Sequence, residues 1–145
     1  MMLSDYTEKL EKKREEISIW MKAKRSEVPI PIYGSVDVRD SGWKVAVVDA
    51  NHFPAGFNNV SEENIAELST LFKDHIHRSH PGCEWVHIYP ESHTRNQAYV
   101  ENISAIKGIV EAAGFTCTVG SPSLNGLKAL HGISGPLMLT GTALN

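Results

Sequence analysis

The sequence of 145 residues lacks the features that mark several protein classes. Its only cysteines, Cys83 and Cys117, have no CxxC spacing, which gives no support to a metal or redox motif and favours structural thiols. No apolar run approaches the roughly 18 residues of a membrane-spanning helix, and the amino terminus has no apolar core or cleavage site of a signal peptide. We therefore expect a cytoplasmic protein without a membrane partner.

The chain also has no large excess of charge of one sign. The formal net charge is −3, and the basic residues between Lys9 and Arg25 alternate with glutamates three and four positions away. This pattern is typical of a solvated helix face, so we expect no nucleic-acid partner. The seven histidines include no HExxH pattern, which argues against a structural zinc site. GxSxG, P-loop and GxGxxG motifs are absent too, so the hydrolase, P-loop and dinucleotide-binding classes lose their simplest support.

The composition that is present indicates a globular protein. Apolar residues make up 41% of the chain, and the length suits a single domain over residues 1–145. Residues 4–26 carry a broken helical stripe of apolar side chains, which predicts a leading helix packed on the outside of the fold. Residues 43–48 are apolar and β-branched, which predicts a central strand covered on both faces.

The second half of the chain alternates between helical and strand patterns. Ser61 predicts the start of one helix, Gly114 predicts the end of another, and strands are expected at residues 85–89 and 115–119. This alternation predicts βαβ units, and hence a Rossmann-like three-layer α/β domain with a mostly parallel sheet. Residues 120–145 predict one further strand, at 136–140.

A polar loop follows the first predicted strand, at residues 51–59. Ligands of open α/β sheets bind at the carboxyl ends of the strands, where this loop lies. Its residues Asn51, Asn58 and Asn59 offer amide groups that suit a small polar ligand. The alternative is a turn in which the asparagines only satisfy backbone groups.

A second polar loop, at residues 91–96, follows the next predicted strand. Arg95, Thr94 and the amides at the start of the following helix suit a carboxylate or a phosphate. The alternative is a helix-capping loop with a surface arginine. Arg39, near the expected sheet edge, is by itself typical of an ordinary surface ion pair.

Three sequence strings carry a resemblance to a known family: SVDVRDSGWK at residues 35–44, VDANHFPAGFNN at 48–59 and YPESHTRN at 89–96. Together they resemble the amino-terminal region of the proteobacterial-type glutamate–cysteine ligases, over roughly residues 4 to 121. Long irregular motifs in the same order are far more specific than a single short motif. The resemblance implies an α/β domain of the pre-ATP-grasp type in an ATP-grasp enzyme of glutathione biosynthesis.

Those enzymes join the γ-carboxyl of L-glutamate to the amine of L-cysteine through an acyl phosphate, with ATP and Mg²⁺. The resemblance implies a set of substrate-binding residues, namely Arg39, Asn51, Asn58, Asn59, His93, Arg95 and Asn96. We expect Arg39 and Arg95 to hold carboxylates, and Asn51, Asn58 and Asn59 to hold amino or carbonyl groups. Asp49 and Asn51 also resemble an acid-x-Asn element that helps to hold magnesium in glutathione-synthetase-like ATP-grasp enzymes. No catalytic residue is assigned.

The resemblance ends near Pro122, so residues 120–145 are expected to be a divergent or truncated tail. Nothing after Thr140 resembles the ATP-clamping strands, phosphate-covering loop or carboxylate cluster that phosphoryl transfer needs. We therefore expect a substrate-recognition portion of a ligase that lacks the ATP-grasp domain, binds neither ATP nor Mg²⁺ tightly, and is inactive alone. The alternatives are a stand-alone module that binds a small ligand, and a structural or interaction domain whose loops are only turns.

Overall fold

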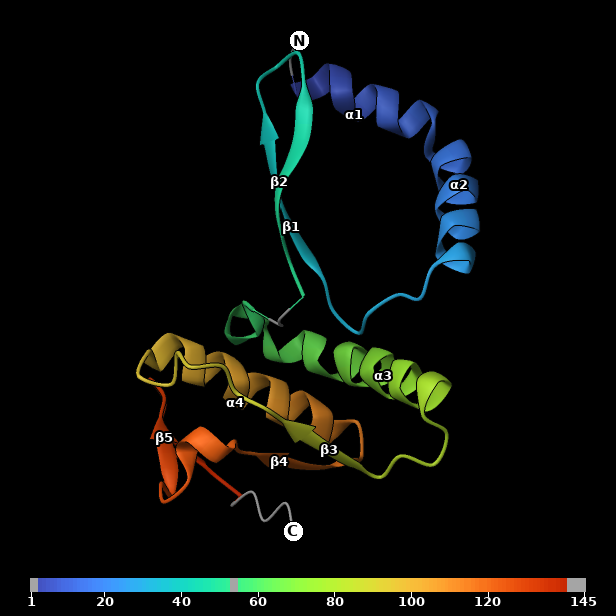
Figure 1. Ribbon diagram of the computed structural model, residues 1–145. Coiled ribbons are helices and arrows are strands. Elements are labelled where there is room, and N and C mark those ends of the chain that lie inside the picture. Colours follow the sequence, from blue (N-terminus) through green and yellow to red (C-terminus); the bar gives the residue numbers. More distant parts are fainter. Residues whose placement is uncertain (1–2, 53–54, 141–145) are drawn as a thin grey trace. The chain divides into compact units, whose positions relative to one another are not determined.

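The computed structural model describes residues 3–52 and 55–140 (Figure 1). The chain divides into two compact units, Met1–Phe53 and Pro54–Asn145, which we describe separately. All buried hydrophobic side chains of the described residues belong to the second unit. The prediction of a single domain stays a prediction. None of the helices in the described ranges is long and apolar enough to span a membrane.

The first unit begins with two helices, α1 (Leu3–Lys12) and α2 (Arg14–Glu27). The predicted leading helix is therefore helical, but it is interrupted at Lys13, whose backbone (φ −107°, ψ 7°) leaves the helical region. The prediction that it packs as an outer helix is not confirmed, because α2 has no buried residue and Trp20 is 57% exposed. Its apolar residues occupy little more than one turn among charged neighbours, too short a stripe to define a packed face.

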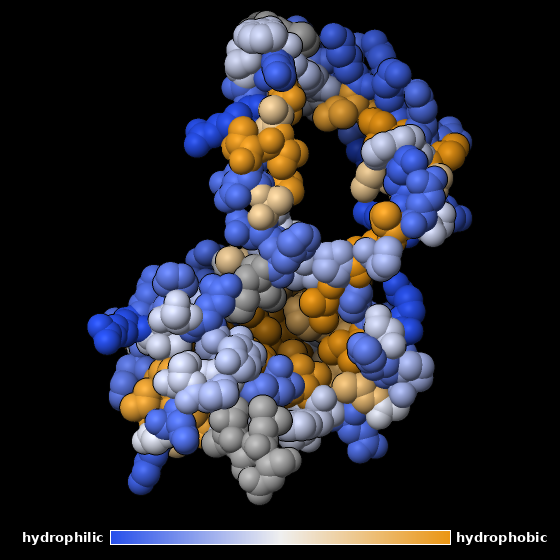
Figure 2. Space-filling view, in the orientation of Figure 1, coloured by the Kyte–Doolittle hydropathy of each residue, from blue (hydrophilic) through white to orange (hydrophobic). Residues whose placement is uncertain are grey.

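A hairpin completes the first unit. Strands β1 (Ser35–Asp40) and β2 (Val45–Asn51) pair in antiparallel fashion, and Gly42, with φ 86°, forms the turn between them. The prediction of a central strand covered on both faces is wrong, since β2 has one partner strand and is exposed along almost its whole length. Valine favours extended backbone whether or not its face is covered, so the run predicted a strand but not its environment. Figure 2 shows hydrophobic side chains on the surface of this hairpin.

A bulge divides the hairpin into a polar and an apolar face. Asp37 pairs with Asp49 and Val38 with Val47, so Val48 is an extra residue on β2. Side chains alternate along a strand, and a bulge shifts that alternation by one residue. Asp49 consequently lies on the opposite face from Val47. The polar face carries Ser35, Asp37, Arg39, Asp49 and Asn51 together with Ala46, and the other face carries Val36, Val38, Val45 and Val47 together with Ala50 and, next to the turn, Asp40.

The second unit contains a βαβ arrangement. In chain order its central elements are α3 (Glu62–Ser79), β3 (Trp85–Ile88), α4 (Gln97–Ala112) and β4 (Thr116–Val119). All four predicted elements are confirmed within a few residues, including Ser61 as the N-cap of α3. Strands β3 and β4 are parallel, and α4 contacts both these strands and α3 (Figure 1).

The sheet differs from the prediction. The described residues form three two-stranded sheets, and only β3–β4 is parallel. The third sheet pairs β5 (Ala129–His131) with β6 (Pro136–Met138) in antiparallel fashion. The α/β class is confirmed, whereas a single, mostly parallel sheet is not found in the described part of the chain. The tail adds to the core, because Leu130 and Leu137 pack with Val100 and Ile103 of α4.

Both cysteines are free thiols. Cys117 is buried in β4, and its burial raises the pKa of the thiol to about 11. Cys83 is half-buried, and its Sγ donates to the carbonyl oxygen of Trp85 at 3.3 Å. The burial of Cys117 fits the structural role predicted for it.

Candidate functional site

The polar face of the hairpin carries three of the predicted residues, Arg39, Asp49 and Asn51. The pairing of Ser35 with Asn51 and of Asp37 with Asp49 places them on one face although they come from two strands. All three are exposed. Asn51 Nδ2 donates to Asp49 Oδ2 at 3.3 Å. Among the described residues Arg39 has no ion pair, so its guanidinium group is available to a carboxylate.

The oxygens of Asp49 and Asn51 are of the type that Mg²⁺ prefers, and Asp37 lies directly opposite Asp49. Both carboxylate oxygens of Asp49 accept hydrogen bonds, one from the Ala50 N–H at 2.9 Å and the other from Asn51. Within residues 3–52 and 55–140, no three His, Cys, Asp or Glu side chains are grouped so as to hold a metal ion. These residues alone therefore do not fit a metal site, and the magnesium role of Asp49 and Asn51 stays a prediction.

In the second unit, the loop at residues 91–96 is tied to the start of α4. The hydroxyl oxygen of Tyr99 accepts the Glu91 N–H at 2.7 Å. The His93 ring meets the Tyr99 ring edge-on, with centroids 6.1 Å apart. Burial raises the pKa of Tyr99, which favours the protonated hydroxyl group. The loop is thus fixed by a helix residue that lies beyond the motif.

Asn96 is the N-cap of α4. Its Oδ1 accepts the N–H groups of Ala98 at 3.0 Å and of Tyr99 at 3.4 Å. The side-chain oxygen of this predicted substrate-binding residue is therefore used to satisfy the helix terminus, as the capping alternative for this loop requires. Arg95, next to it, is exposed and has no ion pair in the described part of the chain. An anion-binding role for this loop rests mainly on Arg95.

The loop at residues 55–59 is anchored further along the same helix. Gly56 has φ 82°, a conformation that favours glycine, and it leads into the short 3₁₀ helix η1 (Phe57–Asn59). The Phe57 N–H donates to Asn102 Oδ1 of α4 at 2.8 Å. Asn58 and Asn59 remain exposed, with Asn58 Nδ2 3.4 Å from Asn59 Oδ1. Residues 53 and 54 of this motif lie outside the described residues.

Helix α4 therefore brings together the two motif loops of the second unit. Asn58 lines a groove together with Glu101 and Ser104 of α4. The anchoring residues Tyr99 and Asn102 were not predicted as part of the site. Tyr99 falls in the apolar spacing of its helix, and an asparagine inside a helical pattern does not by itself indicate what it binds. The hairpin residues form a separate group in the first unit.

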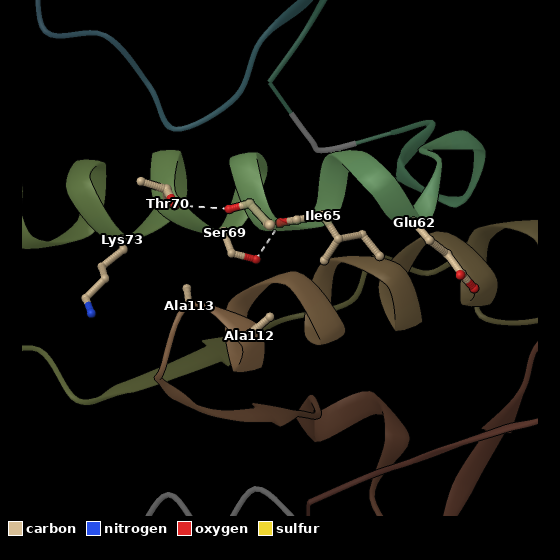
Figure 3. A pocket seen from close by; sticks show the side chains of 8 residues that line it. Glu62, Ile65, Ser69, Thr70, Lys73, Ala112 and Ala113 are labelled. Carbon is tan, nitrogen blue, oxygen red and sulfur yellow. Dashed lines mark hydrogen bonds between the residues drawn. The ribbon is translucent and has the colours of Figure 1, made fainter.

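Another groove runs between α3 and α4 and contains none of the predicted residues (Figure 3). Two hydroxyl groups line it. Ser69 Oγ donates to the Ile65 carbonyl oxygen at 2.7 Å, and Thr70 Oγ1 donates to that of Ala66 at 3.0 Å. Both hydroxyl donors are thus used within α3, and the charged residues of the lining are Glu62 and Lys73.

The chain matches known proteins over most of its length. Residues 7–134 match the family described as glutamate-cysteine ligase (GshA). A protein from Methylobacillus flagellatus KT, which carries the provisional name gamma-glutamylcysteine synthetase, has a crystal structure similar to this one, with a TM-score of 0.79 and 30% sequence identity. The match covers 91% of this chain but 32% of that chain, so this chain spans about a third of its length. Comparison with the curated proteins gives no match. The extent of the family match shows that the chain belongs to the glutamate-cysteine ligase family.

Proposed function

We propose that this chain contributes substrate-binding residues to a ligase that joins the γ-carboxyl of L-glutamate to the amine of L-cysteine in glutathione biosynthesis. The family match supports this reaction. One structural observation carries the binding role: Arg39 in the first resembling string and Arg95 in the third expose guanidinium groups that have no ion pair among the described residues. Both substrates carry carboxylates, which a guanidinium group can bind through two parallel hydrogen bonds.

The remaining residues receive roles that fit their surroundings. Exposed Asn51, Asn58 and Asn59 would offer amide groups to the amino and carbonyl groups of a substrate. Exposed His93 would contribute a ring nitrogen. Asn96 would act through the helix that it caps, because its carbonyl oxygen already accepts two backbone N–H groups.

The cofactor assignment extends the same proposal. We place most of the ATP and Mg²⁺ site in the part of a full-length ligase that has no counterpart in this chain, which spans 32% of the solved relative. Asp49 and Asn51 would supply at most a minority of the ligands of the metal ion. The chain without that part would bind substrate but not turn it over. By the same reasoning, β3, β4 and the two long helices would belong to a larger three-layer, pre-ATP-grasp arrangement.

The test uses the complete natural polypeptide with glutamate, cysteine, ATP and Mg²⁺, and it measures γ-glutamylcysteine formation. Arg39→Ala and Arg95→Ala should each raise the KM for one amino-acid substrate by about 10- to 100-fold. A hydrogen bond to a charged group contributes about 1.5–3 kcal/mol, and every ~1.4 kcal/mol is a factor of ten in affinity. Arg78→Ala is the matched control, since Arg78 is an exposed arginine of α3 that lies outside all three resembling strings.

Unchanged KM values for both substrates in both variants would refute the proposed roles of the arginines. Failure of the wild-type polypeptide to form γ-glutamylcysteine would refute the reaction itself. If calorimetry then still detected glutamate or cysteine binding that Arg95→Ala abolished, the protein would be a small-ligand-binding module rather than a ligase.

A further inference from the structure

Asn102 occupies an unusual position in α4. It is 4% exposed, and it is the one buried amide side chain in the part of the chain that the structure describes. Asparagine is a poor residue for a helix interior, and a buried amide is costly unless its polar atoms are hydrogen-bonded. An apolar residue would stabilise the helix better, so the function of Asn102 must come from its hydrogen bonds.

The partner of Asn102 lies 45 residues away in the sequence. Its Oδ1 accepts the backbone N–H of Phe57 at 2.8 Å, and Phe57 is the first residue of η1. The first N–H groups of any helix lack a partner within that helix and are usually capped by the preceding side chain. Here the preceding residue is Gly56, which has no side chain. Asn102 therefore supplies the cap from another element.

A second contact holds the same turn. The Phe57 ring is buried and packs edge-to-face on Phe72 of α3, with centroids 5.9 Å apart. The amide of Phe57 is thus fixed by α4 and its ring by α3. Asn58 and Asn59 follow directly and remain exposed. Their position is consequently set by residues that lie outside the motif.

Helix α4 holds the other motif as well, because Tyr99 accepts the Glu91 N–H at 2.7 Å. Residues three positions apart are neighbours on one face of a helix, so the side chains of Tyr99 and Asn102 leave α4 side by side. The two loops are therefore anchored on α4 at positions three residues apart, which is less than one helical turn.

We propose that Asn102 is a positioning residue for substrate binding in the ligase: it fixes the Asn58–Asn59 turn relative to the Arg95 loop without touching the substrate. This inference rests on the proposed function, since it assumes that both loops bind substrate. It predicts that loss of the Asn102 oxygen weakens substrate binding by disordering the turn.

The test compares three variants of the complete natural polypeptide. Asn102→Ala should raise the KM for one amino-acid substrate by about tenfold, with a smaller effect on kcat, because the turn must be ordered on binding. Asn102→Asp keeps an oxygen acceptor for the Phe57 N–H and should recover most of the lost affinity. Ser69→Ala is the matched control: Ser69 is also a buried polar residue of this helix pair, 5% exposed, but its hydroxyl group bonds to the Ile65 carbonyl oxygen within α3 rather than to a loop. It should leave both KM values within twofold of the wild type.

Hydrogen exchange of the Phe57 amide in the wild-type protein gives a second readout that does not depend on whether a variant folds. In the wild-type protein this amide should be as well protected as the amides of α4, and in Asn102→Ala it should exchange much faster. An unprotected Phe57 amide in the wild type would overturn the inference, as would a KM for Asn102→Ala no different from that for Ser69→Ala.

The two proposals can fail separately. If Arg39→Ala and Arg95→Ala raise KM but Asn102→Ala behaves like the Ser69 control, only the positioning role is refuted. If wild-type protein forms no γ-glutamylcysteine, the proposed function fails. Protection of the Phe57 amide would still show that its hydrogen bond to Asn102 forms.

Discussion

Glu101 connects α4 to the turn between β5 and β6. Its Oε2 accepts the Ser134 N–H at 3.0 Å, and a Cβ atom placed on Gly132 would come within 2.7 Å of the same oxygen. The turn therefore approaches the carboxylate closely, and a side chain at position 132 would displace the end of the Glu101 side chain. Hydrogen bonds from the side chain and the backbone of Ser134 lower the pKa of Glu101.

This contact should make the stability of the protein depend on pH. Because the pKa of Glu101 is lower in the folded than in the unfolded state, ionised Glu101 stabilises the fold above its unfolded pKa, and this stabilisation is lost as pH falls through the lowered folded pKa. We expect Glu101→Gln to lower the melting temperature at pH 7 and to have a progressively smaller effect on acidification below about pH 4.5. Thermal denaturation followed by circular dichroism at several pH values measures this difference. Glu67→Gln, at an exposed position of α3, is the control. A Glu101→Gln effect that did not shrink with acidification would contradict the assignment.

At the scale of single residues, the sequence predicted the exposed candidate substrate-binding residues better than the residues that hold their loops in place. Arg39 and Arg95 lie in motifs whose resemblance singled them out, and both are exposed as a carboxylate ligand should be. Asn102 and Tyr99 act through contacts with residues 45 and 8 positions away. Such pairings depend on how α4 packs, and no local pattern of the sequence contains that information.

At the scale of elements, the start of α4 offers a direct test of the role of Asn96. Asn96→Ala should destabilise the protein by about 1 kcal/mol, because the N–H groups of Ala98 and Tyr99 lose their cap. Asn96→Asp keeps a capping oxygen and should retain wild-type stability. Urea denaturation measures both effects, with Asn125→Ala as the control at an exposed loop position. If Asn96→Ala changed substrate KM without changing stability, Asn96 would bind substrate directly instead of acting as a cap.

The elements that the sequence predicted correctly are those with strong periodicity. Helices α3 and α4 each bury one apolar face, so their spacing was informative. The valine run of β2 predicted a strand, but β-branched residues suit a buried strand and an exposed hairpin alike. Strand β5 covers only Ala129–His131, which is too short for an alternating pattern to be recognised. The break at Lys13 lies inside a sequence that is otherwise well suited to a helix.

At the scale of the whole molecule, the hydrophobic core is unevenly distributed. Every buried hydrophobic residue among those described lies between Phe57 and Leu137, in the second unit. The first unit contributes two exposed helices and a two-stranded hairpin, which is marginally stable by itself. Folding of the second unit should therefore not depend on the first.

Residues 54–145, produced alone, should unfold in a single cooperative thermal transition and keep the Phe57 amide protected. Residues 1–53, produced alone, should show no cooperative transition, because a chain without a buried core has little surface to expose on heating. Circular dichroism and calorimetry of the two polypeptides measure this. A cooperative transition in residues 1–53, or its absence in residues 54–145, would contradict the assignment of the core to the second unit.

The buried thiol of Cys117 has a consequence for a protein whose proposed substrate is itself a thiol. With a pKa of about 11, only about one Cys117 side chain in a thousand is ionised at pH 8, and the thiolate is the form that attacks disulfides. Cystine, the oxidised dimer of cysteine, should therefore leave Cys117 unmodified. Half-buried Cys83 is then the position at which mixed disulfides would form first as cellular cysteine becomes oxidised.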